Sequence, residues 1–128
     1  MINHYERSDG LPPVNGYSHA TSGAGTLVAV SGQLPVDADG SIVAGDALAQ
    51  ARQVFANLTT ALRAAGATPA DVLRLNFYLI DLADLAAVRT ARDEFVAGGP
   101  PPASSLIQVV GLVLPAAKLE IDALAVMS

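Results

Sequence analysis

The order of apolar and polar residues along the chain predicts alternating strands and helices. Residues 1–25 hold only short extended pieces between turns, whereas residues 26–35 form a mostly apolar run that predicts a strand. The stretch DADGS at residues 37–41 predicts a tight turn. Between residues 46 and 65, apolar side chains recur at spacings of three and four, which places them on one face of a helix. Gly66 follows at a position where helices commonly end.

The second half of the chain repeats this order and then ends in two strands. Residues 73–81 alternate apolar and polar side chains, as a half-buried strand does. Asp84 is placed to cap a helix that runs to about residue 97. An apolar stretch at 105–113 and an alternating stretch at 118–126 predict the last two strands.

These elements predict a single α+β domain that covers residues 1–128, with both helices on the same face of one mixed sheet. The opposite face would still carry apolar side chains. Hydrophobic residues make up 52% of the chain, and no apolar stretch reaches the roughly 18 residues that cross a bilayer. We therefore expect no membrane association, and we expect other copies of the chain to cover the open face.

The charge and composition of the chain limit the kinds of molecule that it is expected to bind. The net charge is −5, and the seven basic residues are scattered, so the sequence does not favour nucleic acid as a partner. There is no cysteine, which excludes disulfides and thiolate chemistry. The N-terminal residues lack the apolar segment of a signal peptide, and we expect a cytoplasmic protein.

The residue pattern gives no sign of a metal, a nucleotide or a nucleophilic serine. His4 and His19 lack partners at metal-ligand spacing, so we expect no metal. The glycines do not have the spacing of a phosphate-binding loop, and the serines lack a G-x-S-x-G turn. We therefore expect no cofactor and no serine hydrolase.

Glu120 is the most notable acidic residue, because it lies within a predicted strand between two apolar residues. A carboxylate that faces a pocket there is suited to hold or activate a water molecule as a general base. The alternative is that strand alternation places Glu120 and Asp122 on a solvated face. The residue pattern leaves both interpretations open.

Four segments, taken together, resemble the RidA/YjgF family of reactive-intermediate deaminases. They are VSGQLPVDADGSIV, the long stretch from ALAQAR to LIDLADL, the tetrapeptide PPAS and the stretch KLEIDALA. The resemblance extends from Tyr17 to the C-terminus. It implies a chorismate-mutase-like fold with one mixed six-stranded sheet. It also implies a homotrimer whose sheets line a central barrel, with small-molecule pockets in the clefts between subunits.

Active members of this family hydrolyse enamines and imines such as 2-aminoacrylate to ketoacids and ammonia without a cofactor. The resemblance assigns a pocket role to Tyr17, Ser31 and Gly32, and it assigns the water-positioning role to Glu120. Older names for the family include endoribonuclease and translation inhibitor, which the acidic charge of this chain does not support.

The chain departs from the family pattern at two positions. The family motif P-A-R-[ST] is Pro102-Ala103-Ser104-Ser105 here, so Ser104 replaces the arginine that pairs with the substrate carboxylate. Losing that pair would cost about 2–5 kcal/mol in binding, or roughly 30-fold to several thousand-fold. Arg89 replaces a pocket asparagine, and it is either a substitute cation in the pocket or an ordinary surface arginine.

Two functions follow from the residues and the resemblance. One is an imine or enamine hydrolase whose substrate preference has shifted toward substrates without an α-carboxylate. Its substrate-binding residues would include Ser104, Ser105 and Arg89. The other is a trimer that binds a metabolite without catalysis. Turnover of 2-aminoacrylate and of other imines distinguishes them.

Overall fold

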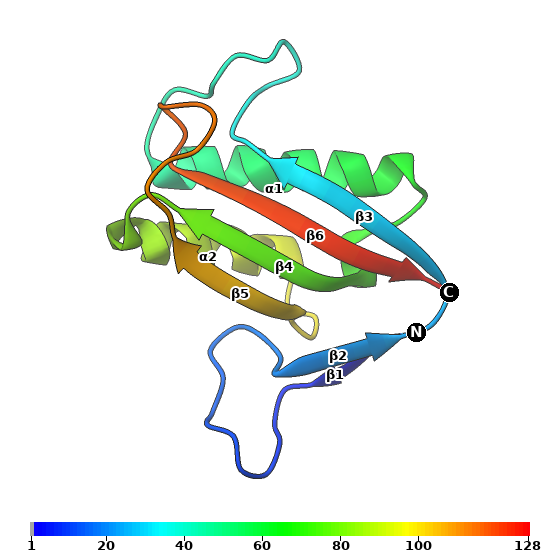
Figure 1. Cartoon of the computed structure of the whole chain (residues 1–128). Helices are drawn as coiled ribbons and strands as arrows, with labels where there is room; N and C mark the ends of the chain where they lie inside the picture. Colours follow the sequence, from blue (N-terminus) through cyan, green and yellow to red (C-terminus); the bar gives the residue numbers. More distant parts are fainter. Residues whose placement is uncertain (1) are drawn as a thin grey trace.

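The computed structural model describes residues 2–128, which form six strands, two α-helices and two short 3-10 helices (Figure 1). In chain order the elements are β1 (Ile2–Tyr5), β2 (Ala20–Gly23), β3 (Thr26–Gln33), α1 (Ala47–Ala64), η1 (Pro69–Asp71), β4 (Val72–Leu79), η2 (Leu82–Asp84), α2 (Leu85–Val96), β5 (Ala103–Gln108) and β6 (Leu119–Met127). No helix among these residues is long and apolar enough to span a bilayer.

The strands form two sheets. The main sheet has the order β3-β6-β4-β5, in which β6 is antiparallel to both neighbours and β4 is parallel to β5. The strands β1 and β2 pair with each other as a separate antiparallel hairpin beside the main sheet (Figure 1). The α+β class and the mixed sheet are therefore confirmed, but the expected single six-stranded sheet is divided into four strands and two.

The division has a local cause. Gly25, at a φ of 140°, turns the chain between β2 and β3, and a side chain there would overlap the backbone of Met127 at the end of β6. The hairpin is not part of the main sheet's ladder. It contacts β4, where the Thr21 hydroxyl donates a hydrogen bond to the Leu73 carbonyl over 2.7 Å.

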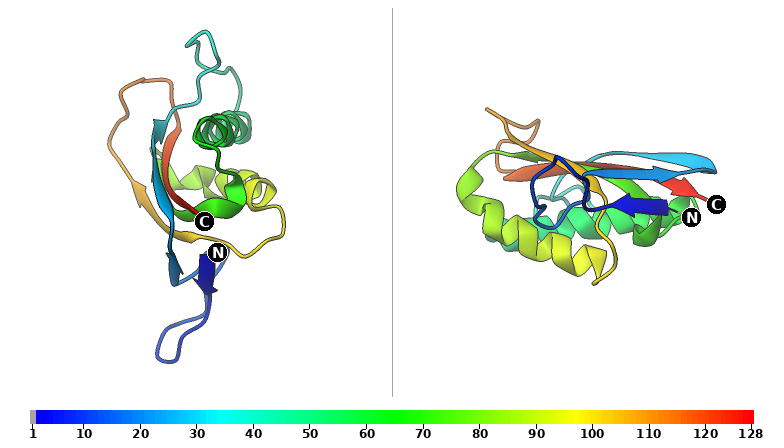
Figure 2. Two further views of the ribbon diagram at one scale, coloured as in Figure 1. Left: turned by 90° about the vertical axis from the view of Figure 1, so that its right-hand side faces the viewer. Right: turned by 90° about the horizontal axis from the view of Figure 1, so that it is seen from below.

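Both helices pack on one face of the main sheet, as the sequence predicted (Figure 2). Leu58 and Leu62 of α1 and Val88 of α2 are buried against Leu75 and Ile121 of the sheet. The opposite face of the sheet carries no helix (Figure 2), so its side chains remain open to contact with other molecules.

Element boundaries agree with the sequence to within two residues, with one exception. The strand expected at 105–113 is β5, which begins at Ala103 and ends at Gln108. Its hydrogen-bonded partner β4 ends at Leu79, opposite Gln108, so no ladder is available beyond that point. The apolar residues that follow are in a loop, where Val110 and Val113 are exposed.

Candidate functional site

A cavity of about 260 Å³ lies between α2 and β5, at one edge of the sheet. It is lined by Asn15, Tyr17, Phe77, Val88, Arg89, Arg92, Ser104 and Leu106. The cavity therefore brings together three of the residues singled out in the sequence, which come from a loop, a helix and a strand. This volume is just below the usual range for ligand pockets, which suits a small metabolite.

The proline-rich loop before β5 holds Tyr17 in place. Ser18 is buried, its hydroxyl donates to the Pro101 carbonyl over 2.6 Å, and its N–H donates to the Pro102 carbonyl over 3.0 Å. These two bonds tie the residue after Tyr17 to the residues just before Ser104. The segment GGPPPASSL thus fixes two loops against each other at the mouth of the cavity.

His19 completes this arrangement. Its ring packs edge-on against Tyr17 with 5.9 Å between ring centroids, and its Nε2 lies 2.7 Å from the Pro12 carbonyl oxygen. Among the residues that the structure describes, no three His, Asp or Glu side chains are grouped to hold a metal ion.

Two arginines one helical turn apart reach the cavity from α2. Arg92 is mostly buried, and its Nε and Nη2 both donate to Asp93 Oδ1, over 3.1 and 2.9 Å. Its guanidinium lies against Gly16, whose φ of 76° and lack of a side chain allow this contact. Arg89 is half-buried, and within residues 2–128 it has no hydrogen-bond or ion-pair partner. The structure thus places Arg89 in a cavity beside Ser104.

Glu120 lies on the other face of the sheet. It is opposite Tyr78 in the register of β6 and β4, and both are half-buried. Its carboxylate lies against Gly32, where any larger residue would overlap it. Ser31 and Gly32 occupy an irregularity in β3, between the paired residues Val30 and Gln33. Glu120, Ser31 and Gly32 therefore form a second group, and Glu120 has no hydrogen-bond partner within residues 2–128.

Strand alternation keeps these two groups apart within one chain. Phe77 lines the cavity beneath α2, and the next residue, Tyr78, shares its face with Glu120. Because successive side chains of a strand point to opposite faces, the sheet separates the cavity from Glu120. Ser105 follows the same rule: its hydroxyl accepts a bond of 2.9 Å from Arg74 Nη2, on the face opposite Ser104.

A polar network that the sequence did not reveal lies beside Glu120, along β4 and β6. Asp122 accepts hydrogen bonds from the Tyr78 hydroxyl and from Asn76 Nδ2, both 2.8 Å long, and Asn76 Oδ1 accepts one from Arg74. The bond to Asp122 raises the pKa of the Tyr78 phenol above its ordinary value, and burial adds to the effect. The alternating polar positions of 73–81 and 118–126 were the signal for this network, but their register was not known.

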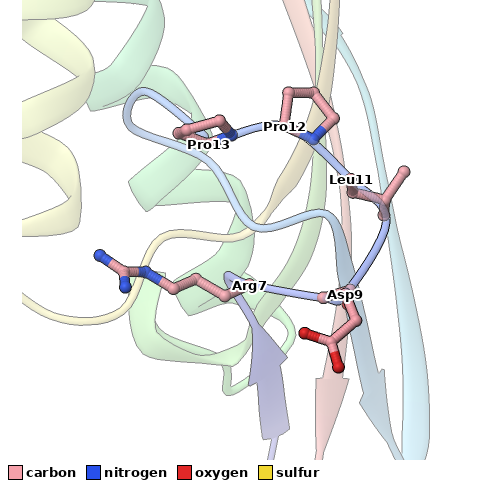
Figure 3. Close-up of a pocket in the computed structure, with 6 residues that line it drawn as sticks. Arg7, Asp9, Leu11, Pro12 and Pro13 are labelled. Atoms are coloured by element: carbon pink, nitrogen blue, oxygen red, sulfur yellow. The ribbon is translucent and has the colours of Figure 1, made fainter.

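A larger concavity, of about 580 Å³, lies in the loop of residues 7–13 (Figure 3). Its lining comes from this single exposed loop, and the side chains of Arg7 and Asp9 point in different directions. A binding site needs polar groups that converge on a ligand. The smaller cavity beside α2 meets that requirement, whereas the loop does not.

Comparisons with known proteins agree with this description of the fold. Residues 8–127 match the family model described as Endoribonuclease L-PSP. The chain is 40% identical to Protein DfrA of Myxococcus xanthus over 93% of its own length and 92% of the relative's. It is 36% identical to the 2-iminobutanoate/2-iminopropanoate deaminase of Salmonella typhimurium, over 80% of each chain. The crystal structure of the Rid family protein YyfB from Yersinia pestis superposes with a TM-score of 0.90 at 40% identity, over 98% of each chain.

Proposed function

Because the chain belongs to the RidA/YjgF family, we propose that it hydrolyses an imine or enamine metabolite at a site shared between two subunits of a homotrimer. The site would consist of Glu120, Ser31 and Gly32 from one subunit. Tyr17, Ser104 and Arg89 would come from its neighbour.

The observation that carries this proposal is the separation of the two groups by the sheet. Glu120 and the α2 cavity lie on opposite faces of the same sheet, so one chain cannot present both to one small ligand. Rotational symmetry places one surface of a subunit against a different surface of the next. Such an arrangement supports a site that is complete only in the assembly.

The chemistry assigned to Glu120 is that of a general base. Its half-buried carboxylate, unpaired within residues 2–128, would accept a proton from a water molecule as the water oxygen bonds to the imine carbon. When the imine nitrogen is already protonated, this addition gives a neutral carbinolamine. Its C–N bond breaks when Glu120 returns the proton to nitrogen and the hydroxyl group releases its own proton, so the products are a carbonyl compound and an ammonium ion. No electron acceptor is needed. An enamine would first take a proton at carbon to become the imine.

Ser104 sets the expected difference from 2-aminoacrylate deaminases. It is half-buried in the cavity at the position of the family arginine, and it offers one neutral hydroxyl. We therefore expect lower activity on 2-aminoacrylate than in members that keep the arginine, because the position of Ser104 no longer supplies a charged donor for the carboxylate.

The test measures ammonia release from imines generated in situ, which include 2-aminoacrylate, 2-iminobutanoate and an imine without a carboxylate. The wild type should accelerate hydrolysis of at least one imine other than 2-aminoacrylate. Glu120→Ala should lower that rate about 100-fold or more, since a general base contributes this much. Asp39→Ala, which removes an exposed loop carboxylate, is the matched control and should leave the rate unchanged. Equal rates for wild type and Glu120→Ala on every accepted substrate would refute the assignment.

A second candidate is a trimer that binds a metabolite without hydrolysis. The specific observation in its favour is that Ser104 stands where the family has its substrate-binding arginine. A fold can keep its pocket after it has lost a residue that the reaction needs. No acceleration of any imine, together with measurable binding of the corresponding 2-oxo acid, would favour this alternative.

A further inference from the structure

The cavity beside α2 has a net positive lining. Arg89 and Arg92 are the charged residues that line it, and the remaining polar lining comes from Asn15, Tyr17 and Ser104. The charge of Arg92 is balanced by its ion pair with Asp93. Arg89 has no such partner within residues 2–128, although it is half-buried. A partly buried, unpaired guanidinium is a site where an anion binds favourably.

We infer that Arg89 holds the carboxylate of a 2-imino or 2-oxo acid, so that carboxylate recognition has moved from the start of β5 to the face of α2. The inference deepens the proposed function, on which it rests, and it replaces the sequence-based expectation of a substrate without a carboxylate. Ser104 would then contribute a neutral hydrogen bond from the opposite wall of the same cavity.

The apolar part of the lining narrows the ligand class. Phe77, Val88 and Leu106 line the cavity together with the polar residues, and Phe77 and Val88 belong to the buried core. A ligand that fits both parts has a carboxylate at one end and a short apolar side chain at the other. At about 260 Å³ the cavity suits a molecule of this size and not a nucleotide.

The two arginines differ in what they are free to do. The Arg92 side chain is only 11% exposed, and its guanidinium lies against the backbone at Gly16 and pairs with Asp93. Its charge is therefore already balanced, and two of its donor atoms, Nε and Nη2, are engaged. Arg89 lies one turn earlier on the same helix, keeps all its donors, and can present a planar fork to a carboxylate.

The binding test uses 4-methyl-2-oxopentanoate as the probe and its methyl ester as the neutral counterpart, measured by calorimetry on the assembled protein. The wild type should bind the acid, and Arg89→Met should weaken its Kd by about 30-fold or more. Arg63→Met, which removes an exposed arginine in the last turn of α1, is the matched control and should not change the Kd. The ester should bind weakly and equally to all three proteins.

A kinetic experiment distinguishes carboxylate binding by Arg89 from the proposed hydrolysis. The imine of the same acid is generated from leucine by an amino acid oxidase, and a neutral imine is generated from 3-methylbutylamine by an amine oxidase. Arg89→Met should lower kcat/KM for the imine of the acid about 30-fold or more relative to kcat/KM for the neutral imine. Binding of the acid that depends on Arg89, without turnover of either imine, would support the inference while refuting hydrolysis.

Three results would overturn the inference. The first is an unchanged Kd for the acid in Arg89→Met, even if imines are hydrolysed. The second is tighter binding of the ester than of the acid. The third is inorganic phosphate binding as tightly as the acid in a manner that depends on Arg89, because this would assign the cavity to phosphate chemistry.

Discussion

At the scale of single residues, the candidate site depends on how closely a backbone approaches a charged side chain. The backbone at Gly32 leaves room for the Glu120 carboxylate, and the backbone at Gly16 leaves room for the Arg92 guanidinium. In both places any larger residue would occupy the same space as the charged group. The two glycines therefore define where the two charges lie, although neither glycine has chemistry of its own.

Gly32→Ala tests this role for the proposed base. The added methyl group would displace the Glu120 carboxylate, which is the free end of a flexible side chain, so the fold should change little. We expect kcat to fall about 10- to 100-fold, because a displacement of about 1 Å can cost that much. The urea midpoint should be unchanged. Gly99→Ala, where the new methyl group would meet only an ordinary contact of 3.4 Å, should retain full activity. Full activity in Gly32→Ala would contradict the role of Glu120 in its present position.

Sequence could predict the identity of these residues better than their surroundings. The position of Glu120 within a strand predicted a functional carboxylate or a solvated one, and the structure adds that the group is half-buried and unpaired within residues 2–128. Ser104 and Ser105 were grouped together in the sequence, but strand alternation sends them to opposite faces. For Arg89 the sequence left two interpretations open, a pocket cation and a surface arginine. The helical periodicity alone does not show which face of the helix lines a cavity.

At the scale of elements, the start of α1 and the start of β6 are fixed to each other. Gln50 is buried in α1, and its side chain donates to the Ala116 carbonyl over 3.1 Å and accepts the Lys118 N–H over 2.8 Å. Lys118 is two residues before Glu120. The position of the proposed base therefore depends on how α1 begins, which Asp46 determines by accepting the Ala49 N–H over 3.0 Å.

Replacing this helix cap gives a prediction about stability. Asp46→Ala should lower the free energy of unfolding by about 1 kcal/mol, because the N–H of Ala49 loses its acceptor. Urea unfolding at equilibrium measures the change. Asp39→Ala removes a carboxylate for which the structure shows no capping role, and it serves as the control. A loss of the same size in both variants would indicate a charge effect and would refute the cap.

The periodic patterns predicted the helices well and one strand end poorly. Apolar spacing fixes which face of α1 is buried, and Asp46 and Gly66 mark its ends. The apolar residues that continue past β5 did not indicate where this strand ends. β5 ends where its hydrogen-bonded partner β4 ends, and not where its own apolar residues end. The length of β4 was the missing information.

At the scale of the whole molecule, the two halves of the candidate site lie on opposite faces of one sheet. The face without helices carries Glu120, the Asp122 network and the exposed side chains of Leu27 and Ile107. Exposed apolar groups beside a polar network are typical of a surface that another subunit covers. The sequence predicted an uncovered face from its excess of apolar residues. It could not predict that the candidate residues divide between the two faces, since that depends on the register of β4 and β6.

The most direct test of the shared site is complementation between two variants that are each strongly impaired. Glu120→Ala and Arg89→Met are unfolded together and refolded as an equal mixture, with ammonia release from the imine of 4-methyl-2-oxopentanoate as the readout. In a cyclic trimer each mixed assembly contains one site with both wild-type halves, so the mixture should recover about one quarter of wild-type activity. Each variant refolded alone should keep no more than about 3% of wild-type activity at substrate concentrations well below KM. A mixture no more active than the two variants refolded separately would contradict a site built from two subunits.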